Sequence, residues 1–136
     1  MIDRVVQEQD REMLASIREH PLEIPDAYPV KLQVLDLARH VVVAPDGKRY
    51  VLATFDDRRL GRGFVTAVYP QQNGYLTLYR LVVYERSSAT PQEALEWHKE
   101  LAKIIQQGQL TQFVKEAKAA TATGTMAGAV VGQKGR

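Results

Sequence analysis

The spacing of apolar residues changes from helical to alternating and back to helical along this chain. Residues 3–19 predict an amphipathic helix, because their apolar side chains lie near one helical stripe and most charged side chains lie off it. The stripe consists of Ile2, Val6, Met13 and Ile17. Pro21 ends this helix, since a proline restricts the residue before it to extended geometry. Residues 21–29 contain two further prolines and are expected to form an irregular connector.

Beyond this connector the apolar residues follow a period of two, which is typical of half-buried strands. The runs at 30–34 and 39–44 predict either one bent strand or two short ones. The turn Pro45-Asp46-Gly47-Lys48 comes next, in which proline fixes φ and glycine accepts a left-handed position. Residues 50–55 then predict the returning strand of a hairpin.

A longer hairpin is predicted over residues 62–86, where two runs of β-forming residues flank Asn73-Gly74. One face of its second arm carries Leu76 and Leu78 and is expected to receive a helix. The opposite face combines aromatic, apolar and hydroxyl side chains from both arms. We interpret it as an interface for a partner or a ligand platform, or as part of the core if helices cover both faces. The candidate interface residues are Phe64, Thr66, Val68, Tyr75, Thr77, Tyr79 and Leu81.

A capping box predicts the start of the next helix. Thr90 is the expected N-cap, Pro91 takes the first helical position, and Glu93 is placed to reach back to the N–H of the cap. Gly108 suits the left-handed residue that closes a helix. A second, shorter helix is predicted over 110–117 from its i, i+3, i+4, i+7 apolar pattern.

These elements predict an α+β fold: an N-terminal helix, an antiparallel meander sheet of four to five strands, and two C-terminal helices packed on the sheet. Consecutive strands with short connections pair antiparallel, because a parallel return needs a long crossover. The 136 residues fit one domain. We assign it to residues 1–119, followed by an Ala/Gly/Thr-rich C-terminal tail over 120–136.

Composition narrows the possible functions. The chain has no cysteine, which excludes disulfides, thiolate zinc sites and cysteine nucleophiles, and which is compatible with a reducing compartment. Charges interrupt the apolar residues near the N-terminus, so that region does not resemble an export signal. We therefore expect a soluble, cytoplasmic protein with no membrane partner.

Charge is unevenly distributed along the chain. Residues 1–29 hold seven acids against three arginines, a net charge of −4, so the remainder must carry +6 to give the overall +2. Within that remainder, Arg58, Arg59 and Arg62 occupy a glycine-containing loop and form a candidate anion or nucleic-acid site. The adjacent acids Asp56 and Asp57 favour the alternative interpretation, a neutralised and solvated loop.

Motifs for catalysis are missing from the sequence. His20, His40 and His98 lie in different predicted elements without metal-ligand spacing, so we interpret them as structural or surface residues. No phosphate-binding glycine loop or nucleophile elbow occurs. We therefore assign no catalytic residue, metal or cofactor.

The hypothesis that best fits these observations is a small, non-enzymatic interaction or accessory module that self-associates, as a homo-oligomer, through the Tyr/Thr sheet face. One alternative is a nucleic-acid-binding module that uses the three loop arginines. The other is a small-molecule-binding protein or enzyme with a pocket between helix and sheet, for which His98 or Arg80 would have to meet a carboxylate.

Overall fold

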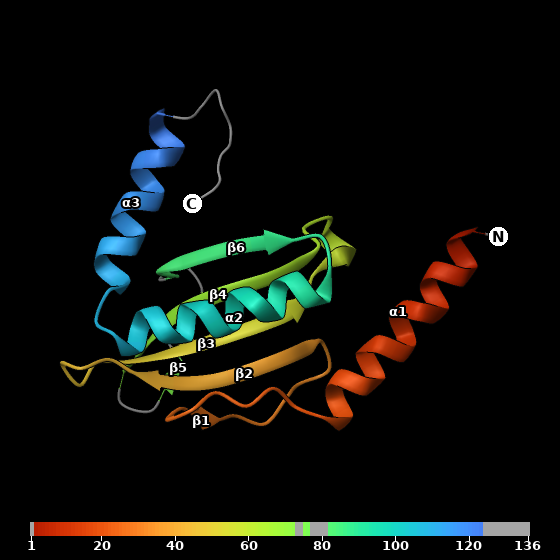
Figure 1. The fold of residues 1–136 in the computed structure, drawn as a ribbon, viewed down its shortest axis with the longest axis horizontal. Helices are drawn as coiled ribbons and strands as arrows, with labels where there is room; N and C mark the ends of the chain where they lie inside the picture. Colours follow the sequence, from red (N-terminus) through yellow and green to blue (C-terminus); the bar gives the residue numbers. More distant parts are fainter. Residues whose placement is uncertain (1, 73–74, 77–81, 124–136) are drawn as a thin grey trace.

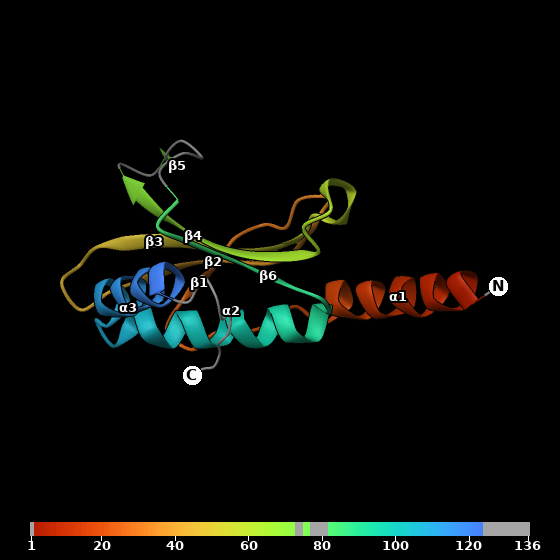
Figure 2. The ribbon, with the colours of Figure 1, turned by 90° about the horizontal axis from the view of Figure 1, so that it is seen from above.

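The computed structural model describes residues 2–72, 75–76 and 82–123, and over these ranges the chain has the predicted α+β architecture (Figure 1). Its antiparallel sheet carries helices on one face (Figure 2). No helix in the described part is long and apolar enough to cross a membrane. In chain order the elements are α1 (Ile2–Glu19), β1 (Tyr28–Pro29), β2 (Asp36–Val43), β3 (Arg49–Asp56), the 3-10 helix η1 (Arg58–Leu60), β4 (Phe64–Gln72), β5 (Tyr75–Leu76), β6 (Tyr84–Ser88), α2 (Pro91–Gln106) and α3 (Leu110–Thr123).

The sheet is the predicted meander. Strands β1, β2, β3 and β4 pair antiparallel in sequence order, and β4 continues the sheet by pairing with β6. The distal end of β4 pairs instead with β5, where Gln72 lies opposite Tyr75. The pairing of Gln72 with Tyr75 is the register expected for the predicted two-residue turn. Residues 73–74 themselves lie outside the described part of the chain.

The main core lies between α2 and one face of the sheet. Residues of β2, β3 and β4 that share this face pack against the apolar stripe of α2 and the start of α3. Figure 2 shows α2 and α3 on this side of the sheet, whereas no described α-helix covers the other side. The buried members of this cluster are Ile24, Val42, Leu52, Val68, Leu101, Ala102, Ile105 and Leu110.

The capped start of α2 is confirmed. Thr90 Oγ1 accepts a hydrogen bond from the Glu93 N–H at 3.1 Å, and Pro91 occupies the first helical position. The return bond differs from the prediction by one residue, because Glu93 accepts from the N–H of Ala89, at 3.4 Å, and not from that of Thr90. Gly108 has the predicted left-handed backbone, with φ of 72°.

Residues 30–34 do not form the strand that their alternation predicts. A turn replaces it, because the Asp36 carboxylate accepts the Gln33 N–H at 2.9 Å and the Asp36 N–H bonds back to the Gln33 carbonyl at 3.1 Å. Arg18 of α1 donates to the carbonyls of Gln33 and Val34. The strand therefore begins at Asp36, and Val34 is 82% exposed.

The second arm of the long hairpin is not one continuous strand in the described residues. It contains β5 and β6, and both pair with β4. β6 pairs over residues 64–68 of β4, whereas β5 pairs with 71–72, and the two registers differ. Residues 77–81 between them lie outside the described part.

Helix α1 extends past the end of the sheet (Figures 1 and 2). Its second half contacts the body, where Leu14 and Ile17 pack against a small cluster that includes Leu37 and Phe64. The side chains of residues 2–10 lie outside the described part. The helix is thus attached to the domain by its C-terminal turns.

Candidate functional site

Four buried polar side chains join α2 to three strands through a continuous chain of hydrogen bonds, which we call the polar chain. His40 Nδ1 lies 2.9 Å from His98 Nε2, and His98 Nδ1 lies 2.9 Å from Thr54 Oγ1. Thr54 Oγ1 in turn lies 2.9 Å from Thr66 Oγ1, which donates to the Ala94 carbonyl at 3.1 Å. His40 is 3% exposed and the other three side chains are fully buried.

Helix periodicity and strand register bring these residues together. His98 lies four residues after Ala94 and three before Leu101, on the buried stripe of α2. On the sheet, Thr54 pairs directly with Thr66 of β4, and His40 pairs with Leu52, the next residue of β3 on that face. The helix-covered face therefore holds a polar centre surrounded by apolar contacts.

Burial makes both imidazoles poor bases. Desolvation and, to a smaller extent, the neighbouring His40 together lower the pKa of His98 to about 3. Desolvation also lowers the pKa of His40, while a hydrogen bond to the Leu22 backbone opposes that shift. Because both shifts are downward from 6.5, the two rings are neutral at pH 7.

The four side chains of the polar chain bond to one another and to the Ala94 carbonyl, so together they clamp α2 to the sheet. His98 bonds to a histidine and a threonine and not to a carboxylate, so the arrangement expected of a helix–sheet catalytic pocket is not what surrounds it. The three histidines lie in different predicted elements, and no spacing in the sequence indicates that two of them pair. The available signal was that His98 falls on the apolar stripe of its helix.

The third histidine is a surface residue, as predicted. His20 is exposed at the end of α1, and its Nδ1 lies 3.3 Å from the Ser16 carbonyl. Within the described ranges, no group of three or more His, Cys, Asp or Glu side chains is placed to hold a metal ion.

The candidate interface residues do not lie together on one free face. Phe64, Thr66 and Val68 point toward α2 and are 2%, 0% and 0% exposed. They belong to the core because β4 places them on the helix-covered face, opposite to the side expected from the sequence. Of the remaining candidates, Tyr75 lies in β5 but its side chain is outside the described part, and Thr77, Tyr79 and Leu81 lie outside it altogether.

The loop after β3 contains the three candidate arginines. Arg58 binds Asp56 with two nitrogens, at 3.0 and 2.8 Å, and its guanidinium lies 4.8 Å from the centre of the Phe64 ring. This hydrogen bond is the main reason why the pKa of Asp56 is lowered. Arg58 is thus held by an acid and an aromatic ring of its own chain.

Arg62 is also paired with acids. Its Nε lies 2.6 Å from Asp57 Oδ2, and its Nη1 lies 3.1 Å from Glu85 Oε2 on β6. Arg59 is exposed. Carboxylates therefore pair with two of the three arginines, which favours the neutralised loop that the sequence offered as the alternative to a nucleic-acid site.

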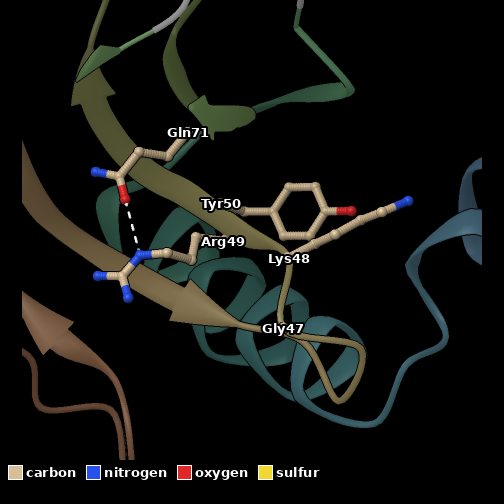
Figure 3. A pocket seen from close by; sticks show the side chains of 5 residues that line it. All are labelled: Gly47, Lys48, Arg49, Tyr50 and Gln71. Carbon is tan, nitrogen blue, oxygen red and sulfur yellow. Dashed lines mark hydrogen bonds between the residues drawn. The ribbon is translucent and has the colours of Figure 1, made fainter. Parts of the chain in front are cut away.

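A shallow hollow of about 270 Å³ lies at the β2–β3 turn (Figure 3). Arg49 Nε donates to Gln71 Oε1 at 3.1 Å, and the Arg49 guanidinium lies 5.7 Å from the Tyr28 ring centre. Lys48 and Tyr50 extend away from this pair, toward the opposite side of the strand (Figure 3). Because its polar groups diverge, the hollow does not focus them on a common ligand.

An aromatic cluster connects β6, α2 and α3. The Arg86 guanidinium stacks on Trp97 at 3.8 Å, and Arg86 also donates to the Tyr84 hydroxyl at 3.4 Å. Tyr84 and Phe113 meet edge to face with ring centres 5.0 Å apart. The cation that this cluster binds is therefore an arginine of the same chain.

Comparisons with known proteins identify no relative of this chain. No family model matches the chain, and no match to it is found among curated proteins or solved structures.

Proposed function

We propose that this chain is a small, non-enzymatic interaction module that self-associates, and that α1 is the arm through which it does so. The observation that carries the proposal is the position of α1, which extends beyond the sheet while its C-terminal turns hold it to the domain. A helix of 18 residues is about 27 Å long, so much of its length lies beyond the contacts made by Leu14 and Ile17.

The sequence of α1 supports a docking role for the projecting half. Ile2 and Val6 lie, by helical position, on the same stripe as Met13 and Ile17. An amphipathic helix gains most of its stability from packing its apolar stripe, and a short helix without such packing is marginal in water. A partner that covers the first half of α1 therefore stabilises the helix itself.

Charge complementarity favours a second copy as that partner. Helix α1 holds five acids against three arginines, a net charge of −2, whereas residues 30–136 carry +6, so the arm of one copy is attracted to the body of another. If α1 of each copy binds the body of the other, the two copies are related by a two-fold axis. Each contact is then made twice, and the assembly closes as a dimer. The same two α1 helices packed side by side would place like charges together, which disfavours a simple helix pair.

Light scattering and sedimentation velocity on the full chain test this proposal over micromolar concentrations. We expect a monomer–dimer equilibrium that Val6→Glu weakens at least tenfold, because the substitution puts a charge on the stripe. Ala15→Glu is the matched control, since Ala15 is exposed and lies on the opposite side of the helix. A wild-type chain that is monomeric at high micromolar concentration would refute self-association, and equal effects of both variants would refute the role of the stripe.

A further inference from the structure

The hydroxyl of Thr66 sets the direction of every hydrogen bond in the polar chain. The Ala94 carbonyl can only accept, so Thr66 donates its single proton to it. Thr66 must then accept from Thr54, and Thr54, having given its proton, must accept from His98. Each bond is determined by the one before it, because a hydroxyl has only one proton.

The tautomers of both rings follow from these bond directions. His98 donates to Thr54 from Nδ1, so in the neutral ring its Nε2 carries a lone pair and must accept from His40. His40 therefore carries its proton on Nδ1. Its Nε2 is left without a proton. Because Nδ1 faces His98, the hydrogen bond with the Leu22 backbone falls to Nε2, and since this bond raises the pKa of His40, Leu22 acts as an acceptor.

When both histidines are neutral, the polar chain has one proton fewer than it has hydrogen-bond contacts. Four side chains contribute four protons, whereas the contacts from Ala94 through the four side chains to Leu22 number five. A proton added to Nε2 of His40 would complete the last contact without disturbing the others. A proton added to Nε2 of His98 would instead place two N–H groups face to face across 2.9 Å and break the bond between the rings.

We propose that the polar chain is a pH-sensitive latch between α2, the sheet and the connector after α1, and that His40 Nε2 is the atom that takes up the first proton. In the neutral form the latch holds α2 on the sheet. Acidification puts the first proton on His40, facing Leu22, and the latch opens when His98 is protonated. Proton uptake is thereby coupled to the connector that carries α1.

The groups around His40 and His98 are mostly apolar, so the two imidazole rings are the groups that titrate in the polar chain. Apolar residues face the rings from α2 (Ala94, Leu101), from β2 (Ala38, Val42), from β3 (Leu52), from β4 (Val68) and from the connector (Leu22). Among the residues that the structure describes, the other titratable or charged groups on this face are Tyr50 of β3 and Tyr84 and Arg86 of β6. Arg86 pairs in register with Thr66, but its guanidinium is stacked on Trp97. The charge interaction that shifts the pKa of His98 comes from His40.

Imidazole ¹⁵N NMR of the full wild-type chain, labelled at histidine, tests the latch directly. At pH 8 we expect both His40 and His98 as the Nδ1–H tautomer, with the exposed His20 as an internal reference. On acidification a proton should appear on Nε2 of His40 while Nε2 of His98 keeps its lone pair. An Nε2–H tautomer of His98 at pH 8, or protonation of His98 before His40, would overturn the proposal.

The variant Thr66→Val separates a directional latch from a merely structural cluster. Without the Thr66 hydroxyl, Thr54 is free to donate to His98 Nδ1, and reversed bonds then satisfy every remaining group, including the contact to Leu22. We therefore expect both rings to switch to the Nε2–H tautomer. Thr111→Val, at an exposed position of α3, is the matched control and should leave both tautomers unchanged. Unchanged tautomers in folded Thr66→Val would contradict the proposal, and if that variant does not fold, the wild-type spectrum decides.

Discussion

Lowering the pH from 7.5 to 5 should destabilise this protein through the buried ring of His98. The unfolded state binds a proton with a pKa near 6.5, whereas burial lowers the pKa of the folded-state ring to about 3. The unfolded chain therefore holds more protons across this interval, and stability rises with pH. The contribution is fully present above pH 6.5 and is lost progressively as the pH falls toward 3.

The magnitude follows from the unfolded-state pKa. At pH 5 the unfolded ring is 1.5 pH units below its pKa, so keeping His98 neutral costs about 2 kcal/mol, against less than about 0.1 kcal/mol at pH 7.5. This figure changes little for any folded-state pKa below about 4, because the folded ring is then neutral at pH 5 in every case. The lowered pKa of His40 adds to the loss with the same sign.

Urea unfolding at the two pH values measures this effect, with the fluorescence of Trp97, the single tryptophan, as the signal. The comparison is made with His98→Gln, whose side chain does not titrate in this range. We expect wild type to lose about 2 kcal/mol more than the variant between pH 7.5 and pH 5. Any constant cost of the substitution cancels in this difference. Equal losses in the two proteins would refute the argument.

Two further predictions concern the sheet and use matched pairs of substitutions, read out by thermal or urea unfolding. Gly63→Ala should destabilise by clearly more than Gly61→Ala, because both have positive φ, but an added Cβ at Gly63 would lie 2.6 Å from the Ser88 carbonyl whereas nothing lies within 4 Å at Gly61. Similar costs at the two glycines would argue against this contact. Leu52→Ala, at a fully buried position, should cost about 2–5 kcal/mol, and Leu60→Ala, 70% exposed, should stay within about 0.5 kcal/mol. A cost at Leu60 as large as that at Leu52 would show that the exposed leucine is packed in solution.

Local signals in the sequence predict much of the fold. Three of these signals depend only on neighbouring residues, and each is found as an element or cap: the capping box at Thr90, the glycine at position 108 and the apolar run within residues 39–44. The alternation at 30–34 misleads because one carboxylate, that of Asp36, turns the chain by accepting the Gln33 N–H. A single side-chain hydrogen bond of this kind leaves no periodic trace in a sequence.

The sites were harder to predict because they depend on register. Which face of β4 meets α2 is decided by the pairing of Thr66 with Thr54, and a shift by one residue would reverse it. From the sequence alone, the helix-covered face of β4 could not be identified, and Phe64, Thr66 and Val68 were expected on a partner surface. The structure buries them under α2. His40 and His98 likewise meet only through tertiary packing.

The polar chain also bears on the order in which the protein folds. Thr54 and Thr66 are 12 residues apart, whereas His40 and His98 are 58 apart. Closing the longer loop costs about 1.4 kcal/mol more in chain entropy. The β3–β4 pairing is therefore expected to form early and the docking of α2 late, so that His98→Gln should accelerate unfolding while leaving the refolding rate nearly unchanged.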